Sequence, residues 1–327
     1  MKFFHIIGSL LAAIFFGSVQ ASRGDQLSIF RDCVKEQISE TCATDGISFK
    51  DGQRVPMHLR LLRWTCASDA DYSCQQAVTQ YLVENNEQIE QFHGKWPFVR
   101  VMGVQEPASV IFSILNGWVH YEGLSLVKQQ LSLRNPMRNY YIFFAYIGMN
   151  AWLWSTIFHV RDLPSTEKMD YFSAGTYVLF GLFYAPIRVF KVYNNERYGI
   201  IVKIWGTICA SALFLHISYL TFITFDYGYN MLANVVVGSL HGLMWLVYSA
   251  IYTKSRPPWA YWPVLTVLAL AGAMSLELFD FPPWLYAIDA HSLWHLATIP
   301  ITWFWYRFLL EDAAWEQKSA SNNVKNA

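Results

Sequence analysis

The sequence predicts an all-α membrane protein, a seven-transmembrane helix bundle with a small disulfide-bearing lumenal N-terminal domain. Hydrophobic residues make up 54% of the 327 residues and charged residues only 15%, whereas a soluble domain has about 25% charged residues. Apolar runs as long as a membrane span recur from residue 107 onward, and four of the five cysteines precede the first run. The net charge is zero and no sizeable basic patch is present, which argues against nucleic acid as a partner.

Residues 1–21 are predicted to be a secretory signal peptide. Lys2 supplies the positive start, residues 6–16 form a short apolar core, and Val19-Gln20-Ala21 precedes a cleavage site at Ser22. The core is too short to cross a bilayer comfortably. Cleavage is therefore favoured over the alternative, an uncleaved anchor.

Residues 22–98 are predicted to form the lumenal domain. It contains Cys33, Cys42, Cys66 and Cys74. Behind a signal peptide, an even number of cysteines predicts two disulfides in an oxidising compartment, with three possible pairings. A zinc site is the alternative, but these spacings lack the CxxC pair of a zinc knuckle. The fifth cysteine, Cys209, lies in an apolar run and is expected to be a packing residue.

Residues 99–310 are predicted to form the membrane domain, followed by a tail over residues 311–327. Each apolar run has about the twenty residues that a helix needs to cross the hydrocarbon core. Tryptophan and tyrosine cluster near the ends of the runs, as interfacial anchors do. The predicted spans are Pro107–Val127, Tyr140–His159, Tyr171–Phe190, Ile200–Leu220, Tyr229–Tyr252, Tyr261–Phe279 and Ile288–Leu309.

The loops between the spans predict the orientation of the chain. Basic residues follow the odd-numbered spans, for example Lys128, Arg134 and Arg138 after the first, whereas the loops around Asp226 and Asp280 contain none. Because positive loops stay in the cytoplasm, the N-terminal domain is expected to be lumenal and the tail cytoplasmic.

Five polar residues are expected to meet at the lumenal end of the bundle. Ser155 and His159 are four residues apart at the end of the second span, and Asp170 precedes the third span. His291 and His295 are also four apart, in the first turns of the seventh span. Residues at this spacing share one face of a helix. Ionisable groups in a membrane are costly and generally functional, so we predict a common site.

Three histidines are sufficient to hold a catalytic zinc ion with one position left for water. We therefore predict His159, His291 and His295 as zinc ligands. Asp170 is expected to take a proton from water or to orient a ligand histidine. Ser155 is expected to donate a hydrogen bond to a developing oxyanion. The alternative, a nucleophilic serine, would lack a base if His159 binds metal.

Three further acidic residues lie near the predicted lumenal face. Glu277, Asp280 and Asp289 are candidates to orient the histidines or the polar head of a substrate. Asp289 is only two residues before His291, so it could act on that histidine only if the loop bends.

Three blocks of the chain resemble a known family. The blocks are FHGKWPFVRVMGVQEPASVIFSILNGWVH (92–120), NAWLWSTIFHVRDLPSTEKMDYFSAG (150–175) and LELFDFPPWLYAIDAHSLWHL (276–296). They are similar to the Per-like family, as are the signal peptide and the cysteine-containing domain. The pattern SxxxH, an aspartate eleven residues later, and HxxxH in the last span also resembles the wider superfamily of alkaline ceramidases, progestin/adipoQ receptors and their relatives (CREST).

The resemblance implies a function in GPI-anchor lipid remodelling. Members of this family act on GPI-anchored proteins, removing the sn-2 acyl chain of the anchor's phosphatidylinositol in a phospholipase A2-type ester hydrolysis. The superfamily pattern places zinc ligation on His159, His291 and His295 and supporting roles on Ser155 and Asp170. The implied location is the membrane of the endoplasmic reticulum, with the Golgi as the alternative.

Two other functions are compatible with the same residues. A ceramidase-like amidase would share the metal site but hydrolyse an amide, and the large cysteine-containing domain argues against it. A receptor or accessory factor would hold a structural zinc ion, although such sites generally have a fourth protein ligand.

Overall fold

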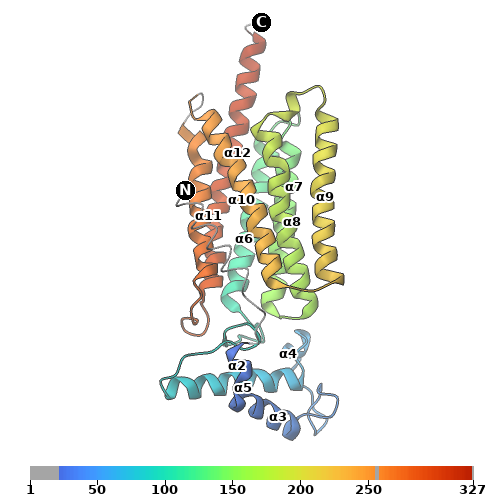
Figure 1. The fold of residues 1–327 in the computed structure, drawn as a ribbon, viewed down its shortest axis with the longest axis vertical. Helices are drawn as coiled ribbons and strands as arrows, with labels where there is room; N and C mark the ends of the chain where they lie inside the picture. Colours follow the sequence, from blue (N-terminus) through green and yellow to red (C-terminus); the bar gives the residue numbers. More distant parts are fainter. Residues whose placement is uncertain (1–21, 255–257, 326–327) are drawn as a thin grey trace.

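Seven long helices, α6 to α12, stand side by side on a smaller helical domain (Figure 1). The structure is a computed structural model, which describes residues 22–254 and 258–325. Within these ranges the chain forms helices and isolated β-bridges but no strand, so the predicted all-α class is confirmed. The predicted signal peptide, residues 1–21, lies outside the described residues.

The helices of the bundle match the apolar runs of the sequence. They are α6 (Pro107–Gln130), α7 (Arg138–Val160), α8 (Pro164–Val189), α9 (Tyr198–Phe222), α10 (Tyr227–Tyr252), α11 (Trp262–Leu278) and α12 (Ala290–Lys325). Helices α6 and α8 each begin with a proline. Proline suits this position because an N–H in the first turn has no acceptor within the helix, so its absence costs no hydrogen bond. Helix α12 continues into the segment predicted as a tail, as far as Lys325.

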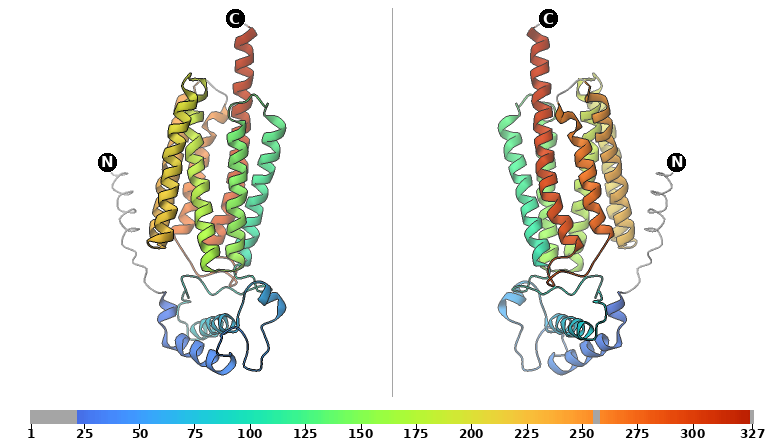
Figure 2. Two further views of the ribbon diagram at one scale, coloured as in Figure 1. Left: turned by 90° about the vertical axis from the view of Figure 1, so that its right-hand side faces the viewer. Right: turned by 90° about the vertical axis from the view of Figure 1, so that its left-hand side faces the viewer.

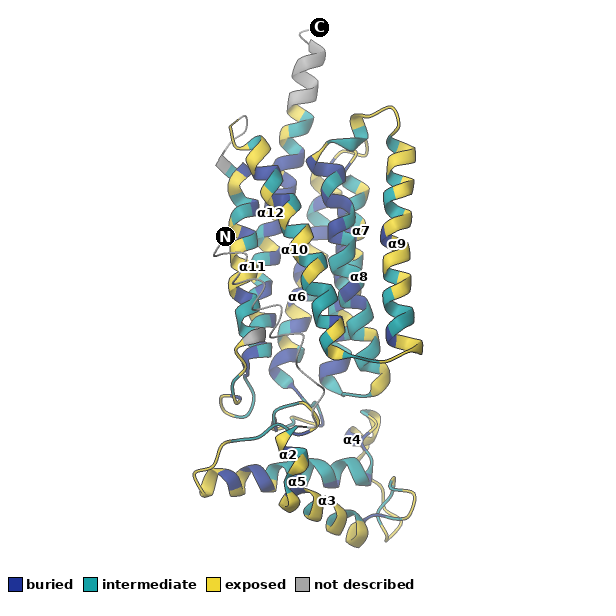
Figure 3. Cartoon of the chain, in the orientation of Figure 1, coloured by how far each residue is buried: buried dark blue, intermediate teal, exposed yellow. Residues whose placement is uncertain are grey.

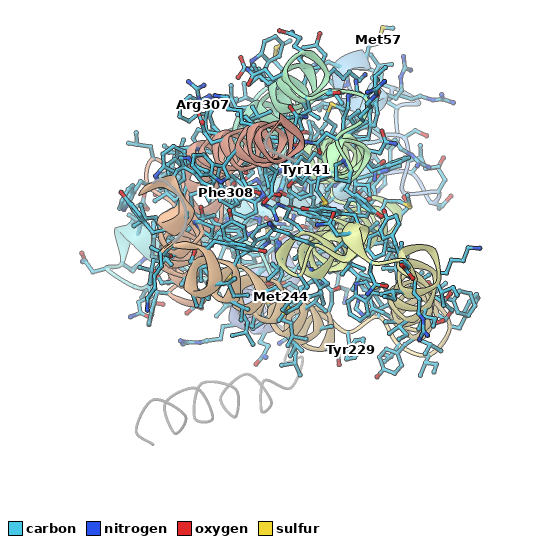
Figure 4. The ribbon with its side chains drawn as sticks, turned by 90° about the horizontal axis from the view of Figure 1, so that it is seen from above. Met57, Tyr141, Tyr229, Met244, Arg307 and Phe308 are labelled. Carbon is cyan, nitrogen blue, oxygen red and sulfur yellow. A yellow bond between two sulfur atoms is a disulfide. The ribbon has the colours of Figure 1, made fainter. Side chains whose placement is uncertain are left out.

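Six helices of the bundle form a closed ring. In order of contact they are α6, α7, α8, α10, α11 and α12, and α12 packs again on α6. Helix α9 packs on α8 outside this ring and is largely exposed (Figure 3). Seen from above, Tyr141 and Phe308 lie inside the bundle and Arg307 lies on its outer surface (Figure 4).

Only part of the bundle is strongly apolar. Among the described residues, three segments are long and apolar enough to cross a membrane: α9, α10 and Trp259–Leu276. The remaining helices carry buried polar side chains, such as Asn116, His120 and Arg188. Polar residues inside a membrane bundle are tolerated when they face its interior and find partners there. The seven predicted spans thus coincide with seven helices, and three segments of the described chain are long and apolar enough to cross a membrane.

The end of the bundle away from the small domain is packed with aromatic side chains. Its core combines the second half of α6, α8, α10 and α12 with the first half of α7. Its largest fully buried members are Tyr141, Tyr184, Trp245, Tyr248, Tyr306 and Phe308. Large rings of this kind bury much apolar surface and hold the helices in register.

A buried ion pair crosses this aromatic core. The Arg188 guanidinium donates to Asp312 at 2.5 and 2.6 Å, and the two side chains are 1% and 0% exposed. The hydroxyl of Tyr248 also donates to Asp312. These contacts join α8, α10 and α12. They also allow both charges to be buried, because a buried charge is tolerated only when it is paired and hydrogen-bonded.

The small domain contains α2 (Arg23–Gln26), α3 (Ser28–Thr41), α4 (Met57–Leu61) and α5 (Cys66–Glu84). Two disulfides, Cys33–Cys74 and Cys42–Cys66, join α3 and the residue after it to α5. Phe30, Val78, Leu82 and Phe92 pack around the first disulfide. The predicted disulfides are therefore confirmed, and the structure selects one of the three pairings. Cys209 is free and buried.

The small domain lies against the ends of the helices that carry the predicted site (Figures 1 and 2). Gln91 and Trp96 donate to the Asp280 carboxylate at 2.7 and 2.9 Å, and the Val99 N–H donates to the Tyr286 carbonyl at 2.9 Å. Asp280 therefore ties the loop between α11 and α12 to the small domain.

We expect peptide mapping under non-reducing conditions to find Cys33 linked to Cys74 and Cys42 linked to Cys66. Replacing Cys33 and Cys74 together by alanine should lower the free energy of unfolding of the small domain by about 4 kcal/mol, because a loop of this length loses its constraint in the unfolded state. Linkage of Cys33 to Cys42 would contradict the structure.

Asp312→Ala should lower the free energy of unfolding by about 3–5 kcal/mol, because it leaves the Arg188 charge buried without its partner. Thermal unfolding in detergent measures the effect, with the exposed Arg307→Ala on the same helix as the control. Combining Arg188→Met with Asp312→Leu should recover part of the loss, since neither charge then remains. An Asp312→Ala protein as stable as the wild type would show that the pair contributes nothing.

Candidate metal centre

Three histidines from two helices meet at the end of the bundle that faces the small domain. His159 lies near the end of α7, and His291 and His295 lie at the start of α12. One ring nitrogen of each histidine lies within 4.8 Å of the others. His159 and His295 are 2% and 4% exposed and His291 is half-buried, so two of the three rings are shielded from solvent.

The start of α12 places its two histidines on one face. The Asp289 carboxylate accepts from the Ser292 N–H at 2.8 Å, and the Ser292 hydroxyl accepts from the Asp289 N–H at 3.0 Å. This reciprocal pair caps the helix. The four-residue spacing then brings the Nε2 atoms of His291 and His295 to 3.0 Å.

His159 is held from the opposite side of the cluster. Its Nδ1 lies 2.8 Å from Oε2 of Glu106, and its carbonyl accepts from the Glu106 N–H at 3.1 Å. Its Nε2 is buried and has no hydrogen-bond partner among the described residues. Such an atom costs about 1–3 kcal/mol unless something binds it.

This arrangement fits a metal ion. Neutral imidazoles are preferred ligands of zinc, and a metal-bound histidine generally donates its other N–H to a carboxylate. The Glu106 contact to Nδ1 leaves Nε2 of His159 for the ion. Ligand nitrogens about 2.0–2.1 Å from a tetrahedral zinc ion lie roughly 3.3 Å apart, close to the observed spacing of His291 and His295.

A second hydrogen-bonded chain supports His295. Its Nδ1 lies 2.9 Å from the Ser113 hydroxyl, which lies 3.0 Å from the Ser155 hydroxyl. Asn116 donates to the His295 carbonyl at 2.7 Å. The predicted Ser155 is therefore linked to a predicted ligand through a serine of α6.

A cation from the small domain completes the polar cluster. The Lys95 ammonium contacts the Glu106 carboxylate and lies 3.1 Å from Asp162. Burial by itself would raise the pKa of Glu106, but Lys95 and His159 hold that pKa well below its usual range. Burial would likewise lower the pKa of Lys95, but the carboxylates of Glu106 and Asp162 outweigh it and raise that pKa.

The structure brings together four of the five predicted residues: Ser155, His159, His291 and His295. The ring nitrogens of the three histidines lie close enough to share a metal ion. Ser155 is linked to His295 by hydrogen bonds through Ser113. The fifth, Asp170, lies on the first turns of α8, near enough for its charge to interact with His159 and His291. The roles assigned to these residues remain predictions.

The three additional acidic candidates lie in different surroundings. Asp289 caps α12 and Asp280 contacts the small domain, so both fix the segment that carries His291. The side chain of Glu277 lies outside the described residues. That these three acidic residues orient the histidines or the polar head of a substrate remains a prediction.

Sequence reasoning missed Lys95 and Ser113 and gave Glu106 no contact with a histidine. One signal was available in α6, where Ser109, Ser113, Asn116 and His120 recur at helical spacing and are all buried. A polar stripe in an apolar helix indicates a face that points into the bundle. The stripe does not indicate which side chains of other helices it contacts.

Most of the chain matches the model of one protein family. The model of the Per1-like family matches residues 56–313, a range that includes the histidine cluster and Glu106. The chain belongs to the Per1-like family. The family membership predicted from the three sequence blocks is therefore confirmed.

Members of this Per1-like family from distant organisms match nearly the whole chain. The chain is 39% identical over 325 residues to "Protein PER1 homolog" of Schizosaccharomyces pombe, covering 99% of this chain and 97% of that protein. It is 36% and 35% identical to "GPI-specific phospholipase A2-like PGAP3" of Mus musculus and Homo sapiens, over 317 and 305 residues. These alignments cover 97% of both chains for the mouse protein and 93% of both for the human protein. No solved structure matches the chain.

His291→Ala should reduce the zinc content of the purified protein to well below one ion per chain, because one of three ligands is lost. Elemental analysis of the detergent-purified protein provides the measurement. His58→Ala, an exposed histidine of the small domain, is the control and should retain the wild-type content. Full occupancy in His291→Ala would exclude His291 as a ligand.

Proposed function

We propose that this protein is a membrane-embedded hydrolase that remodels GPI anchors. In this proposal it cleaves the sn-2 acyl ester of the anchor's phosphatidylinositol on GPI-anchored proteins, a phospholipase A2-type reaction. The proposal rests on the cluster of His159, His291 and His295, in which a buried ring nitrogen of His159 has no hydrogen-bond partner among the described residues. The mammalian relatives are named "GPI-specific phospholipase A2-like PGAP3", which supports both the substrate class and the reaction type.

In the proposed site the three histidines hold a zinc ion. A bound zinc ion supplies a Lewis acid that polarises a carbonyl and makes water a better nucleophile near neutral pH. Glu106 keeps Nδ1 of His159 engaged, so that its Nε2 faces the cluster. Ser113 does the same for Nδ1 of His295.

Two further residues are proposed to assist the reaction. Asp170 lies within electrostatic reach of His159 and His291 and takes the proton of the attacking water. Ser155 donates a hydrogen bond to the oxyanion that develops on the ester carbonyl. Its hydroxyl lies 3.0 Å from Ser113, and its hydrogen bond to another serine supports a donor role more than a nucleophilic one, which needs a base.

The proposal includes a topology. All seven helices α6 to α12 span the membrane, the disulfide-containing domain is lumenal, and the C-terminal end of α12 is cytoplasmic. Two disulfides fit an oxidising lumen. GPI-anchored proteins face that same side, so the site and its substrate meet there. We propose the endoplasmic reticulum membrane as the location, with the Golgi membrane as the alternative.

A ceramidase-like amidase and a non-enzymatic receptor or accessory factor with structural zinc are the competing functions. A structural zinc site is generally closed by four protein ligands, whereas the group found among the described residues comprises three histidines. This observation favours a hydrolytic site. The small domain lies against the end of the bundle that holds the histidines and contacts the loop before α12, which favours a large lipid-linked substrate over ceramide.

The purified protein should release fatty acid and lyso-GPI from a defined diacyl GPI lipid, as measured by mass spectrometry. Release should stop when a chelator removes the metal and return when zinc is added. A ceramide assay run in parallel tests the amidase. A folded, zinc-loaded protein that releases no fatty acid from either lipid would refute both hydrolytic functions and leave the receptor or accessory role.

Asp170→Asn should lower the rate of fatty-acid release by a factor on the order of 10²–10⁴, the usual contribution of a general base. The zinc content and thermal stability should remain those of the wild type. Asp226→Asn is the matched control, since the Asp226 carboxylate accepts from the Tyr229 N–H and caps α10. Wild-type turnover in Asp170→Asn would remove Asp170 from the reaction.

A further inference from the structure

The segment that connects the small domain to α6 reaches the metal centre. It runs over residues 92–106, which we name the site loop, and it begins with the β-bridge between Phe92 and Lys95. It ends at Glu106, the residue that contacts His159. Phe92 itself is 1% exposed and belongs to the core around the Cys33–Cys74 disulfide.

Helix α5 of the small domain holds the first part of the site loop. Side chains of α5 contact the loop between His93 and Arg100. The contacts are Asp71 to His93 at 3.0 Å, Gln76 to the Phe98 carbonyl at 3.1 Å, Tyr72 to the Arg100 N–H at 3.2 Å and Asp69 to the Arg100 guanidinium at 2.5 Å. The Cys33–Cys74 and Cys42–Cys66 disulfides anchor α5 in turn. The backbone of this part of the loop is therefore fixed by the fold of the small domain.

Lys95 projects from this fixed loop toward the bundle. Its ammonium contacts Glu106, lies 3.1 Å from Asp162, and sits 4.0 Å from the centre of the Phe158 ring. Phe158 and Asp162 flank His159 in the sequence. The Lys95 side chain is only 26% exposed, so its attraction to the carboxylates is weakly screened.

Glu106 needs this cation. Its side chain is 6% exposed, and a buried carboxylate is costly unless it is paired and hydrogen-bonded. One oxygen, Oε1, contacts Lys95, and the other, Oε2, lies 2.8 Å from Nδ1 of His159. Each contact therefore fixes the orientation of the same carboxylate.

We propose that Lys95 is a positioning residue of the metal centre, which makes the small domain a part of that centre rather than a separate recognition module. The inference rests on the proposed metal site. Lys95 holds the Glu106 carboxylate, and the carboxylate holds the His159 ring with Nε2 toward His291 and His295. Without the ammonium, the carboxylate loses its cation and no longer fixes the ring.

Metal affinity of the full-length protein in detergent tests this role directly. Lys95→Met should weaken zinc and cobalt binding about 10- to 100-fold, the usual effect of removing support from a metal ligand. Competition with a chromophoric chelator gives the affinity, and the visible spectrum of bound cobalt reports the ligand geometry. Lys95→Arg keeps a cation at this position and should restore most of the affinity. Lys50→Met, which removes an exposed lysine of the same domain, should bind metal as the wild type does.

The outcomes separate positioning from general stability. Weaker binding in Lys95→Met with an unchanged thermal midpoint and rescue by Lys95→Arg would support the proposal. Unchanged affinity in Lys95→Met would overturn it. Weaker binding that accompanies a lower thermal midpoint and is not rescued by Lys95→Arg would assign Lys95 a structural role only, and would also overturn it.

The proposed hydrolysis is measured separately as fatty-acid release. A wild-type protein that binds zinc but releases no fatty acid would refute the hydrolysis, and the affinity ratio between Lys95→Met and wild type would still decide the role of Lys95. A wild-type protein that binds neither zinc nor cobalt would overturn the metal site and the role of Lys95 together.

Discussion

Polar groups inside an apolar helix bundle must be paired, and this constraint organises the structure. Away from water, an unpaired charge is far more costly than the few kcal/mol that keep a protein folded. The bundle meets the constraint at both ends. At one end Arg188 and Asp312 join α8 to α12, and at the other Glu106 and His159 join α6 to α7. At the second end the pairing leaves one ring nitrogen of His159 with no partner in the described part of the chain, as a metal ligand requires.

Helix α12 carries residues of both polar clusters and of the layer between them. His291 and His295 lie in its first turns. Farther along, the Tyr306 hydroxyl is hydrogen-bonded to Nδ1 of His120 at 2.9 Å. Asp312 follows one to two turns later. Close packing against α6 requires small residues, because the Tyr306 ring would meet a Cβ at Gly123 at 2.5 Å. The packing interface between α12 and α6 therefore sets the position of the histidines along the helix axis relative to Ser113 and Asn116.

The small domain contributes to the site through its own stability. The disulfides hold α3 and α5 together, α5 holds the site loop, and the loop presents Lys95 and Glu106. A domain of this size has a small core, and disulfides compensate for that. The two disulfides and the histidine cluster are thus physically connected through the site loop.

Much of the fold and of the site could be predicted from local sequence patterns. Apolar runs of about twenty residues determine seven helices, and the HxxxH spacing determines that His291 and His295 share a face. Because successive helices reverse direction, the sequence also brings His159 and Asp170 to the same end as these histidines. Other features depend on approaches between distant segments, for which a single sequence carries no local signal. The pairing of Cys33 with Cys74, the position of α9 outside the ring, and the contact of Lys95 with Glu106 belong to this class. The order of helices around a ring depends on which side-chain shapes fit together. The partner of a buried charge depends on which chain segment reaches it. Only the tertiary structure therefore decided these three features.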